Sequence, residues 1–316
     1  MASARIKRSL KTIAVFYLAC VMALPAFCGP ANATPAFYID AESQYDYAAA
    51  LFDQGNFAAA AVEYRRFLHF FPDEPLVVNA MYQIGLCLFH DRKFKEAIDA
   101  FQNVIDAFED SRQAMWSYFK ISEAHLAQRD FGSAVLALQN LLTANPEVDV
   151  ADRAHYHMGW IFVELAEWDR ARSQFARISE SNRMKYNLQQ LLDELDQEKQ
   201  IKRKSPRLAG FLSIIPGGGF AYTERYQDAL VAFLVNGAMI WAAYEAFDND
   251  LPALGTCITV VGFGFYAGNI YGGVSSAHKF NDRQTQSFVE QLKENTRISL
   301  GVDPQGGVAF LINYRY

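Results

Sequence analysis

Residues 94–101 read FKEAIDAF, and this order of aromatic, alanine and bulky apolar side chain returns every 37 residues. The opening aromatic occurs four times: Phe57, Phe94, Phe131 and Trp168. Three residues after each aromatic comes an alanine: Ala60, Ala97, Ala134 and Ala171. Four residues after each alanine comes a large apolar side chain: Tyr64, Phe101, Leu138 and Phe175. A fixed period of about 20 to 50 residues is the signature of a solenoid, in which successive repeats stack on one another.

Each period predicts two amphipathic helices that pack on each other. Apolar residues at spacings i, i+3, i+4 and i+7 lie on one face of a helix, and both halves of the period have this spacing. The expected first helices carry a small residue where the two helices would touch: Ala48, Gly85, Ser122 and Gly159.

The pattern resembles the tetratricopeptide repeat, which runs W-x2-L-G-x2-Y, then A-x3-F, then P. The A-x3-aromatic part is present in repeats one, two and four, whereas repeat three has Leu138. The first Trp is missing throughout, and Glu109 and Arg183 replace two of the closing prolines. The resemblance covers about residues 41–180 and implies an all-α solenoid of about four helix pairs that binds a protein or peptide. The 37-residue variant is similar to tetratricopeptide proteins of bacterial envelopes.

The first helices carry a candidate binding surface. One register is aromatic in every repeat: Tyr45, Tyr82, Phe119 and Tyr156. By the resemblance this register faces a concave groove, and neighbouring positions add four more rings: Phe52, Phe89, Trp116 and Trp160. We therefore expect a groove for an apolar or aromatic-rich peptide. The alternative is that these rings only pack adjacent repeats together.

The first 33 residues predict a secretory signal. An apolar stretch from Thr12 to Ala26 follows four basic residues and precedes the A-x-A site at residues 31–33. This signal would place the repeats in the periplasm of a bacterial envelope. An uncleaved anchor is the alternative, because the apolar run extends to Phe27. Neither Cys20 nor Cys28 follows a good lipobox.

A helix over residues 183–203 is expected to cap the solenoid, which would then occupy residues 41–203. Its apolar stripe contains Met184, Leu188, Leu191, Leu192 and Leu195, and acidic residues cover the opposite face. A solenoid needs such a polar end because its last repeat has no further neighbour.

Residues 205–280 predict a helical membrane domain. Ala229 to Phe247 and Leu251 to Val274 are each long and apolar enough to span a bilayer as a transmembrane hairpin. The alternative is a hairpin buried in a soluble protein. Gly264, Gly268 and Gly272 recur at i+4 spacing, which would let another helix pack closely and form a homo-oligomer.

The segment before this hairpin leaves several topologies open. Residues 216–222 read PGGGFAY and resemble the Pro-Gly-x-Gly-x-x-Tyr opening of small bacterial membrane domains of unknown function. Residues 208–222 could span the membrane, dip into it or lie flat on it. Five basic residues precede the segment, where they would favour the cytoplasmic side or anionic lipid headgroups: Lys199, Lys202, Arg203, Lys204 and Arg207.

Residues 281–316 predict a polar helix, from Phe288 to Asn295, and then a short β-hairpin. Its strands would be Arg297 to Val302 and Val308 to Tyr316, around a turn rich in Gly and Pro. The second strand alternates apolar and other side chains, which is typical of a strand with one covered face.

Composition and motifs exclude several classes of function. The 316-residue chain is 51% hydrophobic and has a net charge of −6, so it has neither the composition of a disordered protein nor a basic footprint for nucleic acid. It contains no H-E-x-x-H, G-x-S-x-G or P-loop motif, and we expect no catalytic residues, cofactor or metal. The sequence favours a non-enzymatic envelope scaffold that is tethered to a membrane. A transport or secretion component with an oligomeric hairpin is the alternative, and an enzyme is the third class.

Overall fold

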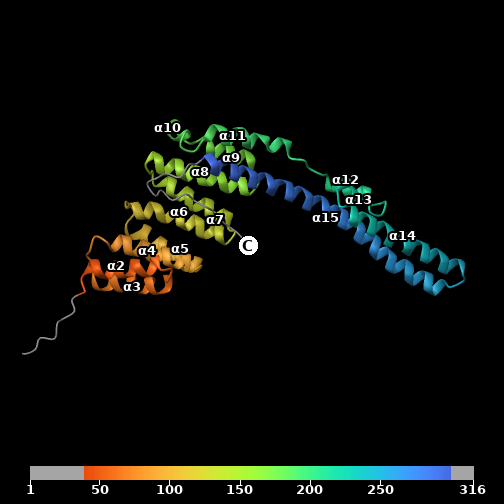
Figure 1. Cartoon of the computed structure of the whole chain (residues 1–316), viewed down its shortest axis with the longest axis horizontal. Coiled ribbons are helices and arrows are strands. Elements are labelled where there is room, and N and C mark those ends of the chain that lie inside the picture. The colour runs from red at the N-terminus through yellow and green to blue at the C-terminus, as the bar shows by residue number, and fades with distance from the viewer. Residues whose placement is uncertain (1–38, 300–316) are drawn as a thin grey trace, which may run out of the picture. The chain divides into compact units, whose positions relative to one another are not determined.

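The computed structural model of the protein describes residues 39–299, and the side chains of residues 39–296 (Figure 1). The described part is helical throughout, without strands. The chain divides into two compact units, residues 1–87 and 88–316. The predicted signal over residues 1–33 lies outside the described residues.

The first unit holds helices α2 (Ala41–Asp53) and α3 (Phe57–Phe70) and most of α4 (Val77–His90), inside which the division falls. Asp40 and Asn56 cap α2 and α3 by accepting hydrogen bonds from backbone N–H groups. The core of this unit is built from side chains with at most 1% exposure: Ala48, Ala60, Tyr64 and Phe67.

The second unit continues the same helix pairs. Its repeat helices are α5 (Phe94–Ala107), α6 (Arg112–Ala127), α7 (Phe131–Thr143), α8 (Val148–Glu164) and α9 (Trp168–Phe175). The repeated aromatic is the first residue of the second helix in all four pairs. All four repeated alanines are 0% exposed, and none of the four large apolar residues that follow them exceeds 1%. The prediction of four helix pairs with these residues in the core is therefore confirmed.

The turn inside each pair also keeps the period. The residue two positions before the repeated aromatic has a positive φ in every repeat: Gly55 (76°), Arg92 (60°), Arg129 (60°) and Ala166 (55°). This left-handed residue lets the next backbone N–H bond five residues back, as Lys93 N does to Leu88 O at 2.9 Å. A non-glycine residue costs about 1–2 kcal/mol in this conformation, so three of the four turns are strained.

The prediction of one continuous capping helix over residues 183–203 is wrong. The chain forms three short pieces there: α10 (Glu180–Arg183), α11 (Leu188–Leu195) and the 3-10 helix η2 (Asp196–Gln200). Asn187 has a φ of 45°, and this left-handed residue turns the chain between α10 and α11. Met184, expected in the buried stripe, is 92% exposed, because it lies before this turn.

Only the second half of the predicted stripe covers the last repeat. Leu188, Leu191 and Leu195 have at most 2% exposure. Asp152 of α8 fixes the start of the cap, because it accepts hydrogen bonds from Ser179 N (3.0 Å) and Asn182 Nδ2 (2.7 Å).

The last helix, α15 (Pro252–Ser299), contributes to the same core, which the sequence analysis did not anticipate. Val289 (6% exposed) and Leu292 (2% exposed) belong to the cluster that contains the cap leucines. The ring of Phe288 lies edge-on to Trp168 with centroids 5.6 Å apart. Lys293 forms an ion pair with Glu164 of α8. The predicted polar helix from Phe288 to Asn295 is thus the end of α15 and completes the cap.

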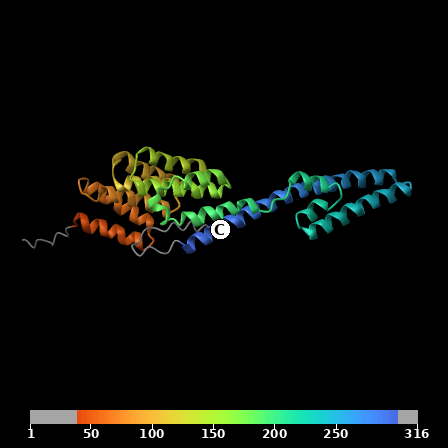
Figure 2. The same cartoon turned by 90° about the horizontal axis from the view of Figure 1, so that it is seen from above.

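The predicted apolar hairpin forms two antiparallel helices, α14 (Tyr226–Asp248) and α15 (Figures 1 and 2). Two shorter helices precede them, α12 (Pro206–Leu212) and α13 (Gly218–Tyr222). Of the described helices, α14 and α15 are long and apolar enough to cross a membrane, and only 11% of the most apolar window of each is buried.

The predicted C-terminal β-hairpin is only partly covered by the described residues. Arg297 to Ser299, the start of its first strand, are helical because α15 continues through Ser299. The remainder of the hairpin, residues 300–316, lies outside the described residues.

Candidate partner-binding surface

In the first unit, the predicted groove rings Tyr45, Phe52 and Tyr82 are half-buried. Tyr45 lies edge-on to Tyr64 at 5.3 Å between ring centroids, and burial raises the pKa of its hydroxyl. Phe52 lies edge-on to Phe57 at 5.2 Å. Tyr45 and Phe52 therefore contact rings of their own repeat, and all three rings keep part of their surface exposed.

In the second unit, the predicted rings divide between core and surface. Phe119 is 1% exposed, so its assignment to the groove surface is wrong and it belongs to the core. Tyr156 is half-buried and stacks on Tyr186 of the cap at 4.4 Å, and burial raises the pKa of Tyr156 to about 12. The other three rings, Phe89, Trp116 and Trp160, are also half-buried.

Charged side chains that the aromatic register does not predict lie over two of these rings. Arg153 of α8 places its guanidinium 4.4 Å from the ring centroid of Trp116 on α6. Lys120 of α6 places its ammonium 5.4 Å from the ring centroid of Phe89. Cations attract the faces of aromatic rings, so these contacts tie neighbouring first helices together.

The period offered a signal for these residues. The position after the register aromatic is polar in every repeat: Asp46, Gln83, Lys120 and His157. Arg153 lies 37 residues after Trp116, its partner in the stack. The residues that directly follow the register aromatics therefore predict a row of polar side chains next to the aromatic ones.

Glu123 is the acidic member of this surface. Its Oε2 accepts a hydrogen bond from Lys120 Nζ at 2.7 Å, and its side chain is 15% exposed. Burial raises the pKa of Glu123, and this is opposed by Lys120 and Arg153. Its other oxygen, Oε1, is buried without a hydrogen-bond partner within the described part of the chain.

His157 lies beside these cations in a neutral state. Burial, with smaller effects of Arg153 and Lys120, lowers the pKa of His157 to about 3. Its ring packs edge-on to Phe119 at 5.3 Å between centroids. At neutral pH His157 therefore adds no charge to the surface beside Lys120 and Arg153.

We define the first-helix surface as Phe89, Trp116, Lys120, Glu123, Arg153 and Trp160. It combines half-buried rings with charges of both signs, which suits recognition of a polypeptide segment. It has no nucleophile–base pair of the kind that catalysis needs. Across residues 39–296, no group of three or more His, Cys, Asp or Glu side chains is placed to hold a metal ion.

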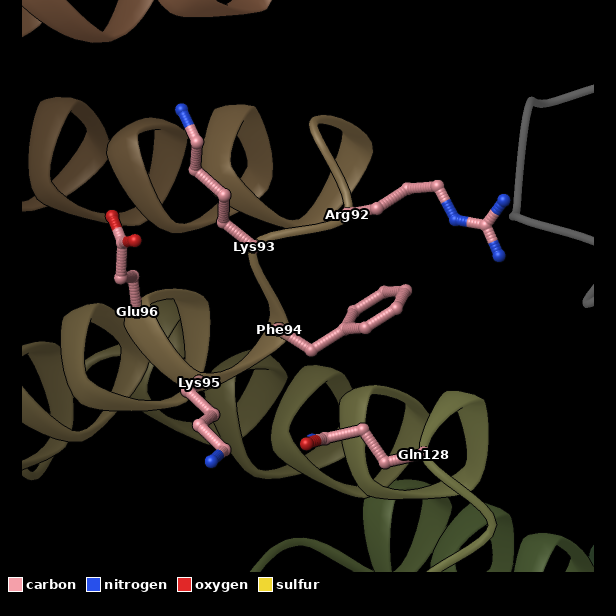
Figure 3. A pocket seen from close by; sticks show the side chains of 6 residues that line it. All are labelled: Arg92, Lys93, Phe94, Lys95, Glu96 and Gln128. Atoms are coloured by element: carbon pink, nitrogen blue, oxygen red, sulfur yellow. The ribbon is translucent and has the colours of Figure 1, made fainter.

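A shallow hollow of about 260 Å³ lies elsewhere, at the turn between α4 and α5 (Figure 3). Figure 3 shows the charged ends of Arg92, Lys93 and Lys95 pointing in three different directions. Lys93 also forms an ion pair with Asp91 at 2.7 Å. Because its charges do not converge, we assign no ligand to this hollow.

The three predicted packing glycines of α15 have different surroundings. A Cβ added to Gly272 would lie 2.6 Å from Cζ of Phe220, so this glycine packs against α13. A Cβ added to Gly264 or Gly268 would meet nothing within 4 Å among the described residues. Close packing inside the chain therefore involves Gly272, whereas Gly264 and Gly268 face open space.

This difference gives a test of self-association through the hairpin. Gly268→Leu is expected to leave the fold of the chain unchanged and to weaken self-association at least tenfold, because its side chain would clash only with a second copy. Gly272→Leu is the matched variant, which should destabilise α13 in every oligomeric state. Sedimentation in detergent measures both effects. Unchanged self-association of Gly268→Leu would exclude this face as a contact between copies.

The model of the tetratricopeptide repeat family matches residues 45–112 and 119–183. No curated protein matches the chain.

Several solved structures are similar to parts of the chain. MamA from Desulfovibrio magneticus RS-1 is 21% identical over 46% of this chain and 76% of its own, with a TM-score of 0.37. A tetratricopeptide repeat protein from Parabacteroides merdae is 15% identical over 82% of this chain and 97% of its own, with a TM-score of 0.39. YrrB, described as a TPR protein with an unusual peptide-binding site, is 19% identical over 70% of this chain and 92% of its own, with a TM-score of 0.35. The family match and the packing of the helix pairs together identify residues 45–112 and 119–183 as tetratricopeptide repeats.

Proposed function

We propose that this protein is a non-enzymatic scaffold of the bacterial cell envelope. Its repeats bind a protein or peptide partner through the first-helix surface, and its helical hairpin anchors them in a membrane. The repeats would then lie in the periplasm, as the predicted signal at residues 1–33 requires.

The observation that carries the binding proposal is the composition of the first-helix surface. Arg153 lies over the ring of Trp116 and Lys120 over the ring of Phe89, and Lys120 also donates a hydrogen bond to Glu123. A peptide laid along α6 and α8 would cover the exposed parts of the half-buried Trp116 and Trp160. Aromatic and arginine side chains contribute much of the energy at such contacts.

The exposure of the hairpin supports the anchoring proposal. Large apolar side chains on both helices are more than half exposed, including Phe233 (54%), Trp241 (71%) and Phe263 (71%). A buried core helix would hide such residues, whereas a bilayer covers them. The tetratricopeptide repeats, by contrast, bury their repeated apolar residues in their own core.

One experiment in cells tests partner binding, membrane anchoring and the location of the repeats together. A photo-crosslinking amino acid at position 116 should capture a protein partner, and the adduct should remain in membranes after carbonate washing. Protease added to spheroplasts should degrade the repeats. Adducts recovered only from the cytosol, or repeats that resist protease in spheroplasts and are cleaved after lysis, would contradict the envelope proposal.

Arg153→Ala should weaken partner capture at least tenfold, because it removes the cation above Trp116 at the centre of the first-helix surface. The matched control is Arg170→Ala on α9, whose guanidinium lies 4.0 Å from the ring centroid of Phe162. Both variants lose a cation–ring contact worth about 0.5–2 kcal/mol of stability. Equal capture by both variants would exclude a binding role for Arg153.

An oligomeric transport component remains a second candidate. The open surroundings of Gly264 and Gly268 favour it, because they leave room for another helix. The Gly268→Leu experiment described above distinguishes it from a simple tether.

A further inference from the structure

The segment before the hairpin begins and ends at the same stretch of α15. At its start, Lys204 N donates to Asn281 Oδ1 (2.7 Å) and Asn281 Nδ2 donates to Lys204 O (2.9 Å). At its end, the hydroxyls of Thr223 and Ser276 lie 2.6 Å apart. Residues 205–223 therefore leave α15 at Asn281 and come back to it at Ser276, about 8 Å further along the helix.

The middle of the segment is held further along α15, at Asn269. Gly217 N donates to Asn269 Oδ1 (2.9 Å), and Asn269 Nδ2 donates to Ser213 O (2.7 Å). The break between α12 and α13 therefore lies opposite Asn269. At about 1.5 Å per helical residue, Asn269 is about 18 Å from Asn281, which is roughly half of a hydrocarbon core of about 30 Å.

The segment buries its polar groups and exposes apolar ones. Ser213 and Asn269 are at most 5% exposed, so the irregular backbone at the break is satisfied within the protein. Four apolar side chains are 43–69% exposed: Leu208, Phe211, Ile214 and Ile215. Irregular backbone is tolerated at membrane depth only where protein covers it, and this segment meets that condition.

The charges lie at the entrance of the segment. Lys202, Arg203 and Arg207 are exposed and form no ion pair within the described residues. Residues 226–278 contain no Lys or Arg, and the turn of the hairpin carries Asp248 and Asp250. The end of the hairpin at which the chain enters is thus basic, and the opposite end is acidic.

We propose that residues 205–223 form a re-entrant helical loop that enters only the leaflet nearest the repeats. The loop seats Lys202, Arg203 and Arg207 on the headgroups of anionic phospholipids. This inference rests on the membrane-anchoring part of the proposed function. It accounts for a basic cluster beside secreted repeats, because anionic lipid attracts basic residues on either side of a membrane.

The depth of the loop is measured on the full-length protein in vesicles of phosphatidylcholine and phosphatidylglycerol. With the other cysteines replaced, Ile215→Cys and Phe233→Cys each carry a fluorophore. Nitroxide-labelled lipids should quench both positions, and aqueous iodide should quench neither. If iodide quenched the label at position 215 while lipid quenched the label at position 233, the re-entrant loop would be wrong and the membrane anchor would still hold. Aqueous labels at both positions would overturn the anchor itself.

A second copy of the chain is the other occupant that the exposed apolar face could have. In that case a label at position 215 would be shielded from lipid and from iodide, and Ile215→Cys would form a disulfide between copies. Either result would overturn the lipid contact.

The contact of the basic residues with anionic headgroups is tested with the triple variant Lys202→Gln, Arg203→Gln, Arg207→Gln. Native mass spectrometry of the full chain should show its preference for phosphatidylglycerol over phosphatidylcholine reduced about 100-fold, since each basic residue at the surface contributes roughly 1 kcal/mol. The matched control is Lys95→Gln, Arg112→Gln, Arg177→Gln, which removes equal charge from exposed positions on the repeats. If both variants lost the preference for phosphatidylglycerol equally, the effect would come from net charge, and the proposed lipid site at Lys202, Arg203 and Arg207 would be wrong.

Discussion

Replacing Leu292 by alanine is expected to destabilise the last repeat by about 2–4 kcal/mol. Leu292 is 2% exposed in the core that α15 shares with the cap, so its removal leaves a cavity between them. Hydrogen exchange should accelerate in α9 and α11, and the full chain in detergent should melt at a lower temperature. The hairpin should keep its protection from hydrogen exchange, because it is formed by α14 and the beginning of α15, far from Leu292.

Gln291→Ala is the control for this prediction. Gln291 is exposed on the same turn of α15, so its replacement should shift stability by less than about 0.5 kcal/mol. If Leu292→Ala exchanged as slowly as Gln291→Ala in α9 and α11, the end of α15 would not belong to the core of the repeats.

Acid should weaken the repeats through His157. Its pKa is about 3 in the folded chain and 6.5 in the unfolded one, so between these values only the unfolded state binds the proton. Stability from this group is complete above pH 6.5 and falls as the pH is lowered. Each pH unit is worth about 1.4 kcal/mol, so unfolding at pH 4.5 should cost about 2–3 kcal/mol less than at pH 7.

His157→Gln isolates this contribution, because it removes the titrating ring and keeps a polar side chain. Denaturant unfolding followed by tryptophan fluorescence should show a clearly smaller loss between pH 7 and pH 4.5 in the variant. Lys120, Glu123 and Arg153 are present in both proteins, so their effects cancel in the comparison. The same acid loss in both proteins would mean that His157 is solvated in the fold.

The repeats could be predicted from sequence because their strongest constraint is periodic. Ala97 and Phe101 must fit against a neighbouring helix, and the same fit recurs every 37 residues. Four copies of one pattern make a chance match improbable. The apolar helices α14 and α15 were predictable for a different reason, since length and hydrophobicity alone identify them.

The cap and the loop were harder, because single residues decide them. Asn187 breaks the capping helix by taking a left-handed conformation that no repeat pattern marks. Asn269 holds the break between α12 and α13 through hydrogen bonds with the backbone of residues 213 and 217, which no sequence pattern marks. Asn236, the other buried asparagine of the hairpin, donates instead to Ala232 O of its own helix at 2.7 Å.

The binding surface shows the limit of an aromatic register. Phe119 and Trp116 lie close in sequence, yet the first is in the core and the second is half-exposed. Periodicity predicts which residues are equivalent, whereas exposure depends on neighbouring helices. The buried Glu123 had no signal of its own, since its 37-residue equivalents are Leu86 and Trp160.

The path of α15 has a consequence for synthesis of the protein. The core of the last repeat includes Val289 and Leu292, which leave the ribosome only after both helices of the hairpin have been made. Until then Trp168 lacks the contact with Phe288, and the cap leucines lack their cover. Domains generally fold in order from the N-terminus as they are made. Here the last repeat must wait for the end of α15, so it cannot close until both helices of the hairpin have been made.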